Sequence, residues 1–264
     1  MKFLVMTDIE GVTGVTTFKQ AENSEFGRQM LMNDLLAVVD AVKDSGCEAI
    51  IYDMHTDGRN VDISAVPYPV IMDKPILNDN WRGVNGEEID GLFLVGLHSM
   101  MNDYSLLAHS YLREYEEIYL NNILVGEIGI EAALAGEKNI PLKFISGDDI
   151  GCQEGENLID DLVTCAVKKS LTPETAICYP PEKTKKMLYN AVCEAIKKDI
   201  KPFKVSAPYE IKIKFSQCKY LEVMKEIHPE IFVDDSTVLM RGEKLLPLWS
   251  EYLKYESEMV KKCQ

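Results

Sequence analysis

The sequence predicts an α/β fold, in which a mainly parallel sheet is flanked by helices and followed by a smaller α+β C-terminal portion. Two observations lead to this prediction. Four short apolar segments that are typical of buried strands alternate with segments whose apolar residues recur at helical spacing. After about residue 160, the pattern changes to amphipathic helices and an alternating, half-exposed strand. We therefore expect an α/β domain over residues 1–160 and an α+β subdomain over 161–264, or one continuous domain.

The first part of the chain contains the expected core strands and the helices between them. Gly46 follows the first long amphipathic segment and is typical of the position just after a helix. Asn121 and Asn122 provide the turn of an expected hairpin. The expected strands cover residues 2–6, 48–52, 70–72, 91–97 and 142–146, the hairpin covers 117–125, and the helices cover 25–45 and 127–135.

The second part of the chain has fewer apolar runs. Residues 209–215 (YEIKIKF) alternate between apolar and polar, which is typical of a strand with one exposed face. A second strand is expected over 237–241. Helices are expected over 183–198, 219–227 and 244–262.

The charge of the chain excludes several classes of partner. Its 264 residues include 43 Asp and Glu against 28 Lys and Arg, so the formal net charge is −15. Binding to nucleic acid or to an anionic membrane needs a basic surface, so we expect neither. The sequence also has no apolar run near the ~18 residues of a membrane-spanning helix.

The cysteines and the first residues indicate the compartment. Seven cysteines are scattered along the chain, an odd number without a Cys-x-x-Cys pair, which favours reduced thiols. The apolar stretch over residues 1–6 is too short for a secretory signal. We therefore expect a cytoplasmic protein.

Each expected core strand is followed by side chains that can bind a metal. In open α/β sheets, ligands bind outside the carboxyl ends of the strands, and residues i and i+2 of an extended segment point to the same side. Side chains that are distant in the sequence can therefore converge at one sheet edge. They are Asp8 and Glu10 after the first strand, Asp53 and His55 after the second, His98 after the third, and Asp148 and Asp149 after the fourth.

The residue types favour a metal of the zinc class. Two imidazoles with two or three carboxylates form a donor set that suits Zn²⁺, or alternatively Mn²⁺ or Co²⁺. Glu127, at the start of an expected helix, is a further candidate. Three carboxylates, two divalent ions and a bridging hydroxide make a neutral cluster, whereas a single ion leaves excess negative charge. Two metal ions are therefore the electrostatically balanced choice.

Simpler roles stay open for each residue considered alone. Asp8 could shape a loop or cap a helix, and an isolated histidine such as His55 or His98 is commonly a hydrogen-bonded core or surface residue. His109 could act as a general acid or base, could donate to an anionic intermediate, or could be a helix residue hydrogen-bonded to a neighbour. Lys168 could belong to a solvated face or bind a carboxylate.

Taken together, the motifs resemble those of peptidase family M55, the D-aminopeptidases. The resemblance runs over most of the chain and is loose over the last sixty or so residues. The segments that carry it are TDIEGVTG, YDMHTDGRN, GLHSM, LLAHSY, NNILVGEIGIEAALAG and ISGDD.

The resemblance implies roles for individual residues. It implies two zinc ions per subunit, a catalytic role for His109 and a ring-shaped homo-oligomer, with Asp8 as the ligand that bridges the metals. The implied metal ligands are Asp8, Glu10, His55, His98 and Glu127.

The expected function is that of a zinc-dependent aminopeptidase. Its substrate would be a short peptide with an N-terminal D-residue, such as D-Ala-D-Ala, attacked by a hydroxide that bridges the metals. Two alternatives stay open: a metal-dependent amidase acting on a non-peptide amide, and a non-catalytic protein that binds a metal or a peptide.

Overall fold

The computed structural model describes residues 1–22, 24–73 and 80–263. Its main element is a seven-stranded sheet with the order β3-β2-β1-β4-β7-β8-β9, parallel except for the antiparallel pair β8 and β9. The predicted α/β class with a mainly parallel sheet is therefore confirmed. The strands are β1 (Lys2–Thr7), β2 (Glu48–Asp53), β3 (Val70–Ile71), β4 (Gly91–Leu97), β7 (Leu142–Asp148), β8 (Val163–Thr172) and β9 (Thr175–Cys178).

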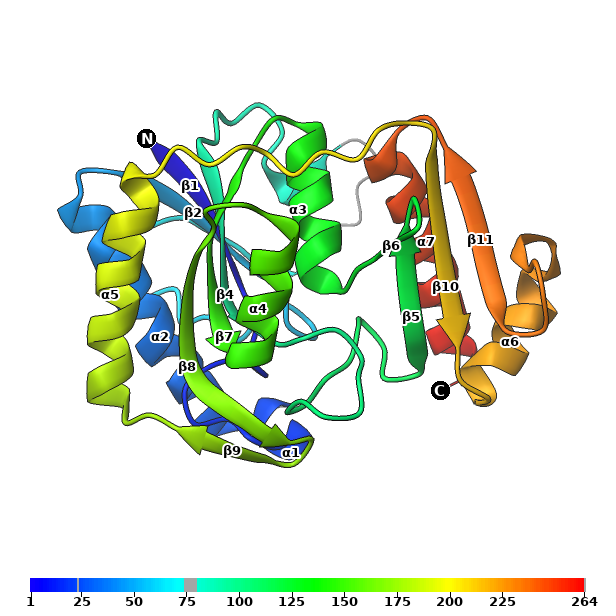
Figure 1. Cartoon of the computed structure of the whole chain (residues 1–264), viewed down its shortest axis with the longest axis horizontal. Helices are drawn as coiled ribbons and strands as arrows, with labels where there is room; N and C mark the ends of the chain where they lie inside the picture. Colours follow the sequence, from blue (N-terminus) through cyan, green and yellow to red (C-terminus); the bar gives the residue numbers. More distant parts are fainter. Residues whose placement is uncertain (23, 74–79, 264) are drawn as a thin grey trace.

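A second, antiparallel sheet lies beside the first, as Figure 1 shows. Its order is β11-β10-β5-β6, with β5 (Tyr115–Leu120), β6 (Ile123–Leu124), β10 (Tyr209–Phe215) and β11 (Thr237–Gly242). The predicted hairpin is thus present, with its turn at Asn121 and Asn122, and both asparagines have positive φ angles.

Helices cover both faces of the large sheet. The helices are α1 (Phe18–Ala21), α2 (Glu25–Asp44), α3 (Glu127–Glu137), α4 (Asp149–Leu158), α5 (Pro181–Lys197), α6 (Lys219–Ile227) and α7 (Leu245–Cys263), with short 3₁₀ turns at Trp81–Gly83 and Pro229–Ile231. In Figure 1, α2 and α5 lie together on one side, and α3 lies on the side of the small sheet. Segment 198–208 crosses from α5 to β10.

Side chains that alternate along β1 pack into two separate hydrophobic cores. Phe3 and Val5 pack with the apolar faces of α2 and α5, whereas Leu4 and Met6 pack with α3 and the small sheet. Successive strand residues point to opposite faces, so one strand can serve both cores. The strand therefore runs through the centre of the molecule, and its carboxyl end carries the first candidate ligands.

The end of α2 shows why it stops where the sequence predicts. Gly46 has a φ of +69°, and its N–H donates to the carbonyl of Lys43. The N–H of Cys47 donates to the carbonyl of Val42 at 3.1 Å. This pair of hydrogen bonds is a Schellman motif, which favours glycine at the left-handed position.

Sheet membership does not change at residue 160. Strands β8 and β9 and helix α5 belong to the layers of the large sheet, whereas β5 and β6, from the first part of the chain, belong to the small one. The division into 1–160 and 161–264 stays a prediction, and the two strands that follow α5, β10 and β11, belong to the small sheet.

Candidate metal centre

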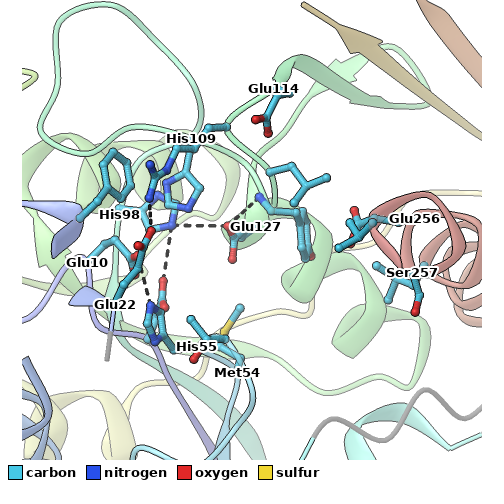
Figure 2. A pocket seen from close by; sticks show the side chains of 18 of the residues that line it. Glu10, Glu22, Met54, His55, His98, His109, Glu114, Glu127, Glu256 and Ser257 are labelled. Atoms are coloured by element: carbon cyan, nitrogen blue, oxygen red, sulfur yellow. Dashed lines mark hydrogen bonds and ion pairs between the residues drawn. The ribbon is translucent and has the colours of Figure 1, made fainter. Parts of the chain in front are cut away.

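Six side chains predicted for the site come together at the carboxyl edge of the parallel sheet. Asp8 and Glu10 follow β1, His55 follows β2 and His98 follows β4, while Glu127 begins α3. These five side chains are all buried. Figure 2 shows Glu10, His55, His98 and Glu127 around one space with His109, which comes from the loop between β4 and β5. The predicted convergence of strand ends is therefore found for four residues, which are joined by Glu127 from the start of a helix and by a loop histidine.

His98 is oriented by its own backbone surroundings. Its Nδ1 lies 3.0 Å from the carbonyl oxygen of Ser99, which can only accept, so Nδ1 carries the proton. Its Nε2 lies 3.4 Å from Asp8 Oδ2 and 3.4 Å from Glu127 Oε1. The free nitrogen of His98 therefore faces two carboxylates, as a metal-binding imidazole does when its other nitrogen is held by a carbonyl.

Glu10 and His55 form a second pair within the cluster. The Nε2 of His55 lies 3.2 Å from Glu10 Oε1. The Nδ1 of His55, Glu10 Oε2 and Asp8 Oδ2 are buried and have no hydrogen-bond partner among the described residues. Buried polar atoms nearly always have hydrogen-bond partners, so three ligand-type atoms without one in a single cluster are suited to bind a cation directly. The residues present therefore fit a metal of the zinc class.

His109 lies in a loop, not in a helix. Leu107 and Tyr111 on either side of it have positive φ angles of 53° and 61°. The Nδ1 of His109 donates to the carbonyl of Leu107 at 2.9 Å, which leaves Nε2 for the site. Ligand atoms of His98, His109 and Glu127 lie within 4.8 Å of one another. The loop thus brings a third imidazole to the edge of the carboxylate cluster.

The charges of the cluster shift the pKa values of its members strongly. Burial and the neighbouring Glu10 raise the pKa of Asp8 well above its usual range. Burial opposes a charge on His55, but its hydrogen bond to Glu10 and nearby carboxylates raise its pKa to about 9. Burial and the positive charge of His98 lower the pKa of His109 to about 4. In the absence of metal, protons on His55 and His98 therefore neutralise the carboxylates.

Three acids grouped with the site from the sequence have structural roles instead. Asp148 caps α4, accepting from the N–H groups of Ile150 at 2.9 Å and Gly151 at 3.0 Å. Asp149 accepts from the N–H of Ser170 at 2.7 Å. Asp53 accepts from the N–H groups of His55 and Asn60, and so shapes the loop that carries His55.

The cluster opens into a cavity of about 900 Å³ between the two sheets. One wall is formed by Phe18 and Arg113, whose guanidinium carbon lies 3.6 Å from the centre of the Phe18 ring. Helix α7 also contributes to the lining, through Val260 and through Ser257, which Figure 2 labels. The small sheet and the C-terminal helix therefore help to enclose the site, although none of the clustered ligand-type side chains comes from them.

The comparisons with known proteins identify the family. The model of the peptidase family M55, described as D-aminopeptidase, matches residues 1–250. The chain belongs to the M55 family. As an M55 aminopeptidase it is a hydrolase. It is 26% identical over 272 residues to a D-aminopeptidase of Bacillus subtilis (strain 168), with 96% of each chain covered.

The fold is also shared with a solved structure. The M55 chain is similar to the zinc-dependent D-aminopeptidase DppA of Bacillus subtilis, described as a self-compartmentalizing protease. The TM-score is 0.89 at 24% identity, and 98% of each chain is covered. No helix among the described residues of the M55 chain has the length and apolar character to cross a bilayer.

Sequence reasoning missed two buried residues that support the M55 site. Glu154 on α4 accepts from the N–H of Met100 at 2.7 Å and from the N–H of Gly126 at 3.2 Å. Lys168 on β8 is fully buried and donates to backbone carbonyls of the loop that carries Glu10. The suggestion that Lys168 belongs to a solvated face or binds a carboxylate is wrong. Neither residue belongs to a recognisable motif, and the alternating apolar residues of β8 (Val163, Cys165 and Val167) place Lys168 on the opposite face, so the spacing gives no sign of its burial.

Proposed function

We propose that the protein is a zinc-dependent aminopeptidase that removes an N-terminal D-residue from short peptides such as D-Ala-D-Ala. The observation that carries this proposal is the buried cluster of ligand-type side chains with three unsatisfied atoms, next to a neutral histidine. The family and the described zinc dependence of the structural relative support it.

Five residues would hold two zinc ions per subunit. Asp8 lies between the Glu10–His55 pair and the His98–Glu127 pair, and its carboxylate interacts electrostatically with both histidines. This position suits a ligand shared by two metals. Mn²⁺ or Co²⁺ could replace zinc, because the donors are oxygen and nitrogen atoms. Bound zinc would supply Lewis-acid chemistry, polarising the peptide carbonyl and making a water molecule held between the metals acidic enough to act as a hydroxide nucleophile near neutral pH.

His109 would move the proton. At neutral pH its imidazole is uncharged, because burial is the main cause that lowers its pKa to about 4. Its Nδ1–H is committed to the carbonyl of Leu107, so Nε2 carries the lone pair. Nε2 can therefore accept a proton from the attacking water and pass it to the departing amine nitrogen. The ring of His109 stacks on the ring of His98, which holds it in place during both transfers.

The cavity would select for a short peptide with a free amino group. Glu114 and Glu256 lie on its wall with the ligand carboxylates, so acidic side chains outnumber the basic ones there, Arg82, Arg113 and Lys261. An N-terminal ammonium is attracted to such a surface, and a buried carboxylate such as Glu10 would steer it beside the scissile carbonyl.

We also propose the setting in which the enzyme works. The relative described as self-compartmentalizing supports a ring-shaped homo-oligomer for this chain. Free cysteines, three of them buried, are consistent with a reducing cytoplasm. Neither nucleic acid nor a membrane is a proposed partner, because the net charge is −15.

A substrate panel on protein of measured zinc content tests the function. The panel contains D-Ala-D-Ala, L-Ala-L-Ala, both mixed dipeptides, an N-acetylated D-Ala-D-Ala and D-alanine amide. We expect hydrolysis of peptides with a free N-terminal D-residue and none of the acetylated peptide. Hydrolysis of the amide alone would instead support a metal-dependent amidase. Recovery of every compound intact from zinc-loaded protein would contradict catalysis.

A further inference from the structure

The loop that carries the first two candidate ligands is wrapped around a buried ammonium group. The Nζ of Lys168 donates to the backbone carbonyls of Glu10, Val12 and Val15, the last two at 3.1 Å and 2.6 Å. Lys168 is 0% exposed. An ammonium group has three donors, and all three are used on one loop. The three carbonyl oxygens thus take the place of the water molecules that would otherwise surround the Lys168 ammonium group.

The same loop is also held by groups on its other sides. The N–H and the hydroxyl of Thr13 both donate to the buried carboxylate of Asp34 at 2.8 Å. The N–H of Gly11 donates to the carbonyl of Gly96 at 2.7 Å. A Cβ on Gly11 would lie 1.9 Å from the carbonyl oxygen of Leu97, the residue before His98. The loop therefore has little freedom to move relative to β4 and the ligand that follows it.

The charge of Lys168 is difficult to explain by packing alone. Burying a cation away from water is costly even when it is hydrogen-bonded, and an apolar side chain of similar length would fill the same space without that cost. Buried acids around the ammonium group favour its charge: Asp148 on the neighbouring strand, Asp34, and the candidate ligand Glu10. Asp8 and Glu10 are buried acids separated by a single residue. A fixed cation that is hydrogen-bonded to the backbone carbonyl of Glu10 offsets part of the repulsion between the two carboxylates.

We propose that Lys168 is a positioning residue that acts as a built-in monovalent cation for the metal site. Its ammonium group would fix the backbone from Glu10 to Val15 and so hold the carboxylates of Asp8 and Glu10 in the geometry that binds zinc. Three carbonyl oxygens from one loop are the ligands that a potassium or ammonium ion takes. This inference rests on the proposed function, because it assigns Lys168 a role toward the zinc proposed there.

The test measures zinc affinity in variants with a matched control. Lys168→Met removes the charge and keeps the length. Lys143→Met is the control, because Lys143 is also buried, donates to one backbone carbonyl (Ile196) and lies at the opposite end of the parallel strands. Zinc affinity of the metal-free proteins is measured by competition with a chromogenic chelator. We expect Lys168→Met to bind zinc about 10- to 100-fold more weakly, as for loss of other groups that orient metal ligands, and Lys143→Met to bind like wild type.

Rescue by a free cation separates this role from a merely structural one. Lys168→Ala leaves space where the ammonium group was, so ammonium or methylammonium ions should restore its zinc affinity. Tetramethylammonium at the same ionic strength should not, because it cannot donate hydrogen bonds. Restoration by all three ions equally would contradict the inference, since it would reflect ionic strength alone.

The remaining outcomes are also decisive. If wild-type protein binds no zinc, the proposed function fails, whatever the variants do. If wild type binds zinc and folded Lys168→Met binds it equally well, only the role of Lys168 fails. If Lys168→Met does not fold, Lys168→Ala with ammonium provides the test. Failure of both variants to fold in ammonium would make Lys168 a core residue and overturn the inference.

Discussion

The imidazole of His109 lies flat against that of His98, with ring centroids 3.9 Å apart and an angle of 9° between the planes. Each ring donates its Nδ1–H to a nearby carbonyl, at 2.9 Å for His109 and 3.0 Å for His98. Both Nε2 atoms are therefore left for the site. Stacking against a cationic neighbour also explains, together with burial, why the pKa of His109 falls to about 4. Under the proposed function, the His98 imidazole would bind the metal and the His109 imidazole would transfer the proton.

Replacing His109 should separate catalysis from metal binding. We expect His109→Ala to keep its zinc and to lose about 10²- to 10⁴-fold in kcat, the usual contribution of a general acid or base. Elemental analysis and steady-state kinetics on the same preparation check both parts. Normal turnover would remove His109 from the mechanism, and loss of zinc would make it a ligand instead.

Asp34 should make the stability of the protein depend on pH. Burial raises its pKa from 3.8 to about 6, opposed by hydrogen bonds from Thr13 and by the charge of Lys168. A raised carboxyl pKa gives stability that is present below the unfolded-state value and lost as pH rises through about 6. Relative to Asp34→Asn, wild type should therefore lose about 2 kcal/mol of unfolding free energy between about pH 4.5 and about pH 7. Urea unfolding of both metal-free proteins measures this difference, and a constant difference across the range would disprove it.

Glu154 should affect zinc binding without touching the metal. Its carboxylate joins the backbone two residues after His98 to the backbone just before Glu127. Glu154→Gln loses one acceptor, so we expect about 10-fold weaker zinc binding. Glu156→Gln on the same helix is the control, because Glu156 is exposed and accepts from the hydroxyl of Thr164, away from the site loops. Equal zinc affinities in the two variants would show that Glu154 has no part in the site.

A methyl group at Gly11 should disturb the site through the backbone. Its Cβ would overlap the carbonyl of Leu97 at 1.9 Å, so the loop or β4 must move. Gly242→Ala is a suitable control, because its nearest neighbour would lie 3.4 Å away. We expect Gly11→Ala to bind zinc more weakly and to unfold at a lower temperature than Gly242→Ala. Calorimetry and zinc titration that cannot distinguish the two variants would show that the close approach is unimportant.

The strand ends explain why much of the site could be predicted. Asp8, His55 and His98 follow strands whose apolar runs are easily recognised, and parallel strands bring their carboxyl ends to one edge. The same reasoning also selected Asp148, because a helix-capping aspartate and a metal ligand can occupy the same position after a strand. The two roles differ only in contacts across the fold, which local sequence does not contain.

The supporting residues could not be predicted for a related reason. The role of Lys168 depends on carbonyls more than 150 positions away, at Glu10, Val12 and Val15. A lysine in a strand is ordinarily an exposed residue, so the sequence favours the wrong environment. The loop around His109 likewise depends on positive φ angles at Leu107 and Tyr111, which are residue types that rarely adopt them.

The central claim is that two zinc ions, held by Asp8, Glu10, His55, His98 and Glu127, enable the chain to hydrolyse a D-peptide. Titration of metal-free protein with zinc, followed by an assay of D-Ala-D-Ala hydrolysis at each addition, tests it most directly. Activity should rise from the level of the chelator control and reach a plateau at two zinc ions per chain. Full hydrolysis in chelator, or no hydrolysis with two zinc ions bound, would contradict it.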